Sequence, residues 1–196
     1  MPMFVLAGIV LAAMSARGVE VPVKAAGLEG HWASDCQPIG KNGRHGVAIQ
    51  ITIKGERMRA EAQMYATNAC QTPTFKLSYR GSIVFQRLAD GSIVFDHMVR
   101  SIILTPQASD VVIQYNMEGD HGCGLQGWKI NVQKSVAGKT CYPFSFPIEG
   151  TTLHDVAWLN GDALRLGAFP ILWSNTVSAK RPTKPSSTVY HKVIGS

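Results

Sequence analysis

The sequence predicts an all-β fold built from about eight to ten short antiparallel strands. Several segments alternate apolar and polar residues, turn signals recur about every dozen residues, and no long stretch has the apolar spacing of a helix. The 196 residues are 45% hydrophobic, which is enough for one domain with a real core. Together these features are typical of an up-and-down barrel or a sandwich.

The clearest strand pair covers residues 47–54 and about 57–67. Apolar and polar residues alternate from Val47 to Lys54, and Lys54-Gly55-Glu56 predicts a tight turn. The second strand carries only small or flexible apolar residues on its inner face, namely Met58, Ala60, Ala62, Met64 and Ala66. These residue types also favour helix, which is the alternative, but their strict alternation favours a strand. Inside a barrel they would leave space for a ligand.

The rest of the chain continues in short segments. Residues 75–88 predict a strand pair or one long bent strand, with Gly81 as a bulge, and a turn at 89–92 leads to a strand over 93–104. Alternation also predicts strands from Val111 to Met117 and from Trp128 to Val132. Strands at 151–159 and 163–168 flank the turn signal Asn160-Gly161, residues 169–187 look irregular, and a last strand covers 188–194.

The first 18 residues predict a signal peptide. Phe4 to Met14 is an apolar run that is too short to span a bilayer, and it ends in small residues. The basic residues that usually precede such a run are missing, so an upstream start or a core strand are the alternatives. We expect residues 1–18 to be the signal, 19–29 a leader and 30–196 the barrel domain of a periplasmic or secreted protein.

The four cysteines predict two disulfides in an exported chain. Three pairings are possible, and the spacing favours Cys36–Cys70 and Cys123–Cys141, because each closes a local loop. A zinc site is the alternative, but the sequence has no Cys-x-x-Cys pair.

Gly30-x-Trp32 at the start of the first strand, with basic residues near the last strand, resembles the lipocalin-like, or calycin, β-barrels. The resemblance implies a single antiparallel up-and-down β-barrel. It also implies that Gly30 allows a close backbone turn and that Trp32 plugs the closed end. Arg181, with Lys192 as second choice, would cover the tryptophan by a cation–π contact.

A narrower set of residues is similar to the lipocalin-like domain of the adenomatosis-polyposis-coli-down-regulated type. The matching elements span most of residues 28–194. They are Gly30-x-Trp32-x-Ser34-x-Cys36, Tyr65 with Cys70-x-x-Pro73, Gly81, Cys123-Gly124 with Trp128 and Cys141, and Arg181-Pro182 with Tyr190. This resemblance implies an enclosed apolar pocket that could hold an acyl chain. The family's signalling role is not carried over, because we expect one domain without a membrane anchor.

The histidines and acids predict neither a metal site nor a catalytic one. Asp96-His97 and His154-Asp155 each combine two members of a catalytic triad, but neighbours on a strand point to opposite faces. Asp120-His121 beside Cys123 is the most suggestive metal cluster, and a glycine-rich loop tethered by a disulfide explains it equally well. We therefore expect no enzyme activity, no metal and no cofactor.

The charge is modestly basic, with a formal net charge of +6 and a pI of about 9.3. One local cluster, Lys180-Arg181-x-x-Lys184, could contact an anionic envelope surface or could simply be a solvated loop. We expect no nucleic-acid partner.

These features predict an exported, non-enzymatic barrel that binds a small apolar or amphipathic, lipid-like ligand such as an acyl chain. The residues expected to line its interior are Met58, Ala60, Ala62, Met64, Tyr79 and Phe85. The alternative is an exported inhibitor or protein-interaction module that acts through the 37–46 loop or the N-terminal arm, residues 19–29. A filled barrel interior would favour the alternative.

Overall fold

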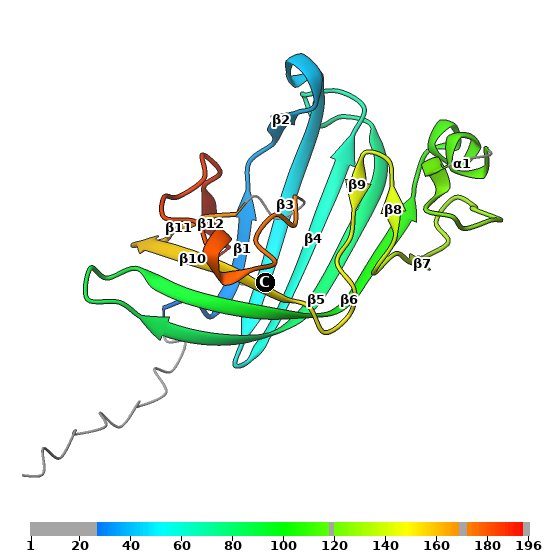
Figure 1. The fold of residues 1–196 in the computed structure, drawn as a ribbon. Helices are drawn as coiled ribbons and strands as arrows, with labels where there is room; N and C mark the ends of the chain where they lie inside the picture. The colour runs from blue at the N-terminus through cyan, green and yellow to red at the C-terminus, as the bar shows by residue number, and fades with distance from the viewer. Residues whose placement is uncertain (1–26, 118–119, 169–171, 194–196) are drawn as a thin grey trace, which may run out of the picture.

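Eight strands close into an antiparallel up-and-down barrel in the computed structural model of the protein (Figure 1). The structure describes residues 27–117, 120–168 and 172–193. The predicted signal peptide, residues 1–18, and most of the predicted leader, residues 19–26, lie outside the described residues. The all-β prediction is confirmed, and the barrel is the correct choice between barrel and sandwich.

The barrel strands follow one another around the wall in chain order, and the first strand pairs with the last. Every neighbouring pair is antiparallel, so hairpins connect most of the strands. The strands of the wall are β1 (Gly30–Ser34), β3 (His45–Lys54), β4 (Arg57–Tyr65), β5 (Pro73–Arg87), β6 (Ile93–Pro106), β10 (Thr152–Asn160), β11 (Ala163–Leu166) and β12 (Tyr190–Lys192).

Shorter elements decorate the wall. β2 (Gln37–Ile39) extends β1 along β3, and the 3₁₀ turn η1 (Lys41–Gly43) follows it at a loop that projects beyond the barrel (Figure 1). A long excursion between β6 and β10 lies to one side of the barrel. It contains α1 (Ser109–Asn116), η2 (Asp120–Gly122), β7 (Lys134–Ser135), β8 (Thr140–Cys141) and β9 (Phe144–Ser145).

The hairpin of β3 and β4 explains why the small residues of β4 leave little space. The inward residues Met58, Ala60, Ala62 and Met64 are buried, which confirms the strand and excludes the helix alternative. The register places Ile49 opposite Ala62 and Ile51 opposite Ala60. Large side chains on β3 therefore fill the room that the alanines of β4 provide.

β5 is one long strand rather than a strand pair, and it is irregular where the sequence predicts a bulge. Its register against β6 shifts between Arg80 and Gly81. A Cβ atom on Gly81 would overlap the hydroxyl of Tyr79, so only glycine leaves the tyrosine its place. The bulge thus sets the position of a side chain in the barrel interior.

The predicted strand from Val111 to Met117 is wrong, because these residues form most of α1. Val111 and Tyr115 lie one helical turn apart and face the protein, whereas Ile113 is exposed. Tyr115 packs edge-on against Trp128 with ring centroids 5.1 Å apart. Seven residues, five of them apolar, fit both the strand period and the helix period, and the contact with Trp128 selects the helix.

The predicted strand from Trp128 to Val132 is also wrong. Trp128 is buried, but Ile130 and Val132 are exposed, so the alternation does not define one buried face. Asn131 adopts a positive φ of 61°, which breaks an extended strand. Pairing with β6 begins after this segment, at the two residues of β7.

The hairpin of β10 and β11 turns where Asn160-Gly161 predicts it, but one residue later. Asn160 pairs with Ala163, so Gly161 and Asp162 form the two-residue loop. Gly161 has a φ of 57° at the first loop position, where a type II′ turn requires glycine. After β11 the chain is irregular apart from η3 (Ser178–Lys180), and it ends the wall with β12.

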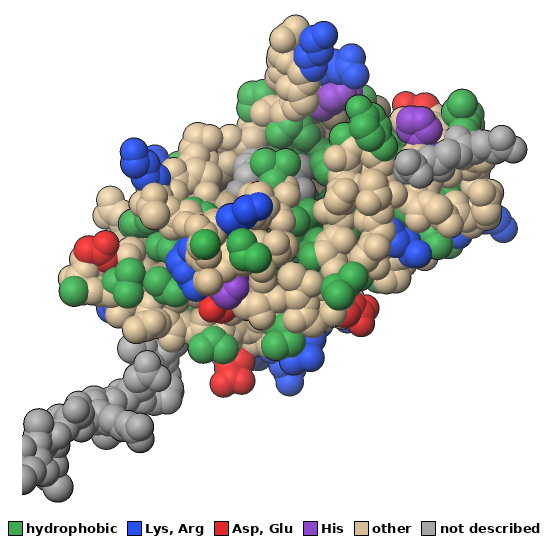
Figure 2. Space-filling model, in the orientation of Figure 1, with side chains coloured by type: hydrophobic (Ala, Val, Ile, Leu, Met, Phe, Trp, Pro, Cys, Tyr) green, Lys and Arg blue, Asp and Glu red, His purple; other side chains and the backbone are tan. Residues whose placement is uncertain are grey.

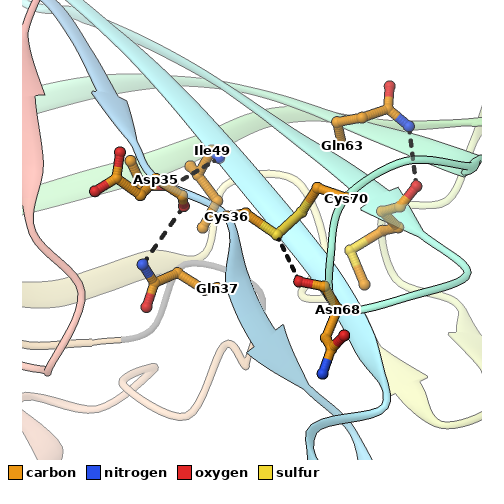
Figure 3. The surroundings of a disulfide bond; sticks show 9 residues. Asp35, Cys36, Gln37, Ile49, Gln63, Asn68 and Cys70 are labelled. Carbon is orange, nitrogen blue, oxygen red and sulfur yellow. Dashed lines mark hydrogen bonds between the residues drawn. A yellow bond between two sulfur atoms is a disulfide. The ribbon is translucent and has the colours of Figure 1, made fainter.

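Two disulfides brace the chain outside the barrel interior. Cys36–Cys70 joins the segment after β1 to the loop between β4 and β5, beside Asn68 (Figure 3). Cys123–Cys141 joins the loop after η2 to β8. These are the two pairs that the spacing favours. Among the described residues, no helix has the length and apolar character needed to cross a bilayer.

Candidate functional site

A small cavity lies inside the barrel and has a volume of about 30 Å³. A buried water needs about 10–15 Å³ by such a measure, whereas pockets for drug-sized ligands span about 300–1,000 Å³. The interior is therefore nearly filled. The lining side chains are Met58, Ala60, Tyr79, Phe95, His97, Leu153, Asp155, Leu166, Ala168, Trp173 and Asn175.

Tyr79 and His97 form the first polar pair of this cavity. Both are buried, and the Tyr79 hydroxyl lies 2.8 Å from His97 Nδ1. Burial raises the pKa of Tyr79. Burial also lowers the pKa of His97 from 6.5 to about 4, with a further lowering by His154 and an opposing effect of Asp96. At neutral pH the pair is therefore uncharged and offers hydrogen bonds rather than charge.

Asp155 is the acidic group of the cavity. Its Oδ1 accepts hydrogen bonds from the backbone N–H groups of Val156 (2.7 Å) and Ala168 (2.9 Å). Burial raises its pKa from 3.8 to about 7, although these backbone N–H groups and the charge of Arg181 act in the opposite direction. The raised pKa favours the protonated carboxyl group, which can donate as well as accept a hydrogen bond.

Trp173 lines the same cavity as these polar groups. Its ring lies 5.7 Å from the Tyr79 ring and 6.3 Å from the Phe146 ring, measured between centroids. Its backbone adopts a φ of 47°, which is strained for a residue with a large side chain. The indole Nε1 is buried and finds no hydrogen-bond acceptor among the residues that the structure describes. We call this indole the Trp173 plug.

Asn175 anchors the segment that carries the Trp173 plug. Its backbone C=O accepts a hydrogen bond from the His154 N–H (2.9 Å), and its side-chain Nδ2 donates to the His154 C=O (3.0 Å). These two bonds tie the residues around Asn175 to β10 where β11 has ended. The plug is therefore held on one side by a fixed backbone.

A charged cluster on the outer side of the wall supports the same segment. Asp96 Oδ1 lies 2.8 Å from Arg181 Nη2 and 3.1 Å from His154 Nδ1. Arg181 Nη1 also donates a 2.8 Å hydrogen bond to the Asp155 C=O. The adjacent pairs of the sequence, Asp96-His97 and His154-Asp155, do point to opposite faces, and the strand register brings their outer members together.

Three of the six predicted lining residues, Met58, Ala60 and Tyr79, line the cavity. Ala62 and Met64 are buried farther along β4 and are not among its lining residues. Phe85 is half-buried and packs on Phe95, with ring centroids 6.2 Å apart. The cavity is smaller than predicted and more polar, because β6 and β10 contribute side chains that the sequence pattern did not single out.

The barrel-closing prediction requires one correction. Trp32 is buried, and its Nε1 donates a 2.9 Å hydrogen bond to the Leu28 C=O. Lys192 Nζ lies 5.5 Å from the centre of its ring, so Lys192 makes the cation–π contact. Arg181 does not, because its guanidinium group pairs with Asp96. Gly30 has a φ of 135°, and a Cβ atom there would lie 3.1 Å from Lys192 Cε.

No known family model matches this chain, and no curated protein sequence matches it. The closed eight-stranded barrel is consistent with a lipocalin-like fold. Among the described residues, no three His, Cys, Asp or Glu side chains gather where they could hold one metal ion.

Proposed function

We propose that this protein is an exported, non-enzymatic barrel that binds one small amphipathic ligand beneath the Trp173 plug. Buried polar groups converge in an apolar cavity beside Trp173, whose backbone is strained and whose indole N–H has no partner among the described residues. Ligand sites commonly combine apolar walls with a few well-placed polar groups. The polar end of the ligand would contact Tyr79, His97 and Asp155.

The size of the cavity limits the ligand. A volume of about 30 Å³ is far below that of an acyl chain, so the Trp173 plug has to withdraw before a ligand with an apolar body can enter. The apolar part of the ligand would then take the place of the indole. A small amphipathic molecule fits this proposal better than a long acyl chain.

The proposed role involves binding without covalent chemistry. His97 has a tyrosine as its partner, and the cavity lining in the described part of the chain contains no serine, threonine or cysteine. Export is supported by the predicted signal peptide and by two disulfides, which persist in oxidising compartments. The narrower resemblance to the adenomatosis-polyposis-coli-down-regulated type also supports an enclosed pocket in a disulfide-bonded barrel.

Native mass spectrometry of the protein isolated from its source cells tests this proposal. We expect a near one-to-one complex with a small molecule, on a chain that begins after Ala16 or Gly18. The variant Tyr79→Phe should retain less of that molecule, and Tyr65→Phe, on the outer face of β4, serves as the matched control. A ligand-free mass for the wild-type protein would contradict ligand binding, and an intact N-terminus would contradict export.

The nearly filled interior favours a second candidate function, an exported inhibitor or interaction module. The loop around η1 projects from the barrel end and carries the exposed residues Lys41 and Arg44 (Figure 1). A protein partner captured by the wild-type chain but not by the double variant Lys41→Glu/Arg44→Glu would support this function. Equal capture by both proteins would exclude this loop as the contact.

A further inference from the structure

The outer face of β4, β5 and β6 carries a cluster of four exposed arginines. Arg57 and Arg59 come from β4, Arg80 from β5 and Arg100 from β6. Lys54, at the end of β3, pairs in register with Arg57 and adds a fifth cation. We call these five residues the arginine face.

The strand register places the cations side by side. Arg59 lies directly opposite Arg80. On β6, Ser101 pairs with Arg80 and Val99 pairs with Gly81, so Arg100 is the extra residue of the bulge. Arg100 is exposed, and the bulge therefore presents its side chain beside Arg80. The result is a row of Arg59, Arg80 and Arg100 across three adjacent strands, which are about 5 Å apart.

Internal pairing does not account for this arrangement. Like charges directly opposite one another destabilise a sheet. In the described ranges, no ion pair involves any residue of the arginine face. The nearest acid along β4, Glu61, pairs with Lys76 at 3.5 Å, and Glu56 lies in the turn before Arg57. Neighbouring arginines that repel one another and have no acidic partner within the described chain indicate that an external anion binds there.

The neighbours of the arginines indicate the chemistry of that anion. The residues opposite the arginines carry hydroxyl groups: Thr52 faces Arg59, Ser82 faces Arg57 and Ser101 faces Arg80. No aromatic ring in the described part of the chain stacks on these arginines. Guanidinium groups bind carboxylate and sulfate oxygens through paired hydrogen bonds, and hydroxyl groups bond readily to sugars.

We propose that the arginine face binds a linear anionic polysaccharide that runs across the strands, with its carboxylate or sulfate groups on the arginine row. A membrane surface would call for apolar side chains among the cations, and single-stranded nucleic acid would call for stacking aromatic rings. The hydroxyl-lined row has neither feature between its arginines. This proposal is independent of the cavity, so either one can fail without the other.

The arginine face also differs from the basic cluster at residues 180–184. There Arg181 is already paired with Asp96, which leaves Lys180 and Lys184 as its exposed cations. On the face drawn in Figure 2, basic side chains are dispersed among apolar and polar ones. The arginine face concentrates five cations on neighbouring register positions, and we assign the contact with anionic envelope material to it.

Binding to immobilised polysaccharides tests the proposal. The probes are polygalacturonate for carboxylates, heparin for sulfates and dextran as the neutral polymer. The full-length protein should bind at least one anionic polymer and not dextran, with an affinity that falls as salt rises. The double variant Arg59→Ser/Arg80→Ser should bind roughly tenfold more weakly, because two charge-assisted contacts are lost.

The matched control removes two exposed cations elsewhere, in the double variant Arg165→Ser/Lys129→Ser. It should bind within about twofold of the wild type, because it keeps the row. If both double variants bound the polymer equally weakly, the proposal would be overturned, because net charge alone would then explain the binding. No binding to either anionic polymer, or tighter binding to anionic phospholipid vesicles or single-stranded DNA, would also overturn it.

A charge-conserving variant, Arg59→Lys/Arg80→Lys, keeps the test valid if the serine variant folds poorly. It retains both charges but loses the planar fork of each guanidinium group. We expect binding several-fold weaker than that of the wild type. If this variant bound with wild-type affinity, the anion would not be recognised through paired hydrogen bonds from the guanidinium groups.

Discussion

Two tryptophans of the barrel, Trp32 and Trp173, are held in opposite ways. Trp32 is only 1% exposed, its N–H bonds to the Leu28 C=O, and Lys192 covers its ring. Trp173 is half-buried, has a strained backbone and an N–H without an acceptor among the described residues, and lines a cavity together with polar side chains. A fully buried tryptophan with a bonded N–H stabilises the fold. A tryptophan with an unbonded N–H and a strained backbone costs less to displace.

The surroundings of the two rings repeat this contrast. Trp32 lies at β1 and β3, next to the aliphatic residues Ile51 and Ile53. Trp173 lies near Tyr79, His97 and Asp155, groups that are costly to bury without full pairing. The packing around Trp32 should therefore contribute more to the stability of the barrel than the packing around Trp173.

The largest expected effect is the loss of stability in Trp32→Ala. Removing a fully buried tryptophan should lower the free energy of unfolding by about 3–5 kcal/mol. Urea denaturation followed by circular dichroism measures this loss. Trp173→Ala, the matched change, should cost less than about 2 kcal/mol, because its ring is half-buried and its backbone strained. Equal losses would remove the distinction between the two tryptophans.

The polar groups beneath Trp173 should respond to pH. The pKa of Asp155 is about 7 when folded and 3.8 as its ordinary value, so its contribution to stability is lost as pH rises from about 4 to 7. His97, with a pKa lowered from 6.5 to about 4, acts oppositely: its contribution is lost as pH falls from about 6.5 to 4. The two trends therefore partly cancel in the wild type.

Asp155→Asn should remove the contribution of Asp155 to the pH dependence of stability and leave that of His97. Between pH 4 and pH 8, we expect the stability of the variant relative to the wild type to rise by about 1–3 kcal/mol. An asparagine Oδ1 can still accept the hydrogen bonds from Val156 and Ala168, which makes the change conservative. Urea unfolding at a series of pH values measures it, and parallel profiles for both proteins would contradict a buried, titrating Asp155.

Removing the Trp173 plug should create a binding cavity. Trp173→Ala should open a cavity of indole size and should let an apolar fluorescent dye bind several-fold more tightly than to the wild type. The cost in stability should be about 1–2 kcal/mol. Trp158→Ala, another half-buried tryptophan but on the outer side of β10, is the matched control and should not gain dye binding. Similar gains in both variants would argue against a specific cavity.

The smallest expected effect concerns the cover of Trp32. Lys192→Met should cost about 0.5–1 kcal/mol, the usual size of an exposed cation–π contact. Lys184→Met removes an exposed lysine from the same part of the chain and should change nothing measurable. A double-mutant cycle with Trp32→Phe should give a coupling of similar size, and zero coupling would show that Lys192 only lies near the ring.

The sequence predicts the barrel wall well because its long strands carry their pattern locally. Val47 to Lys54 alternates without a break, and a half-buried strand is the simplest fold for it. The excursion between β6 and β10 is different. Val111 to Met117 has too few residues to separate a strand from a helix, and its outcome depends on Trp128, which is distant in sequence.

The candidate site could be predicted only in part for a similar reason. Tyr79 is visible as an inward residue beside Gly81 in an alternating strand. Asp155 and His97 can be noticed in their adjacent pairs, but only the register of β6 against β10 shows which member points inward. Trp173 lies in a segment without periodicity, so no local signal marks it. Its backbone conformation and its neighbours are properties of the folded chain.

The pairing of β1 with β12 has a consequence for the folding of this chain. The barrel closes only when Trp32, near the start of the domain, lies beside Lys192, near its end. Whatever process delivers the chain from its N-terminus, most of the wall can form hairpin by hairpin while this seam stays open. Because contacts between distant parts of a chain form slowly, seam closure should be the last and slowest folding step. Until then, the facing edges of β1 and β12 are open to pairing with other chains.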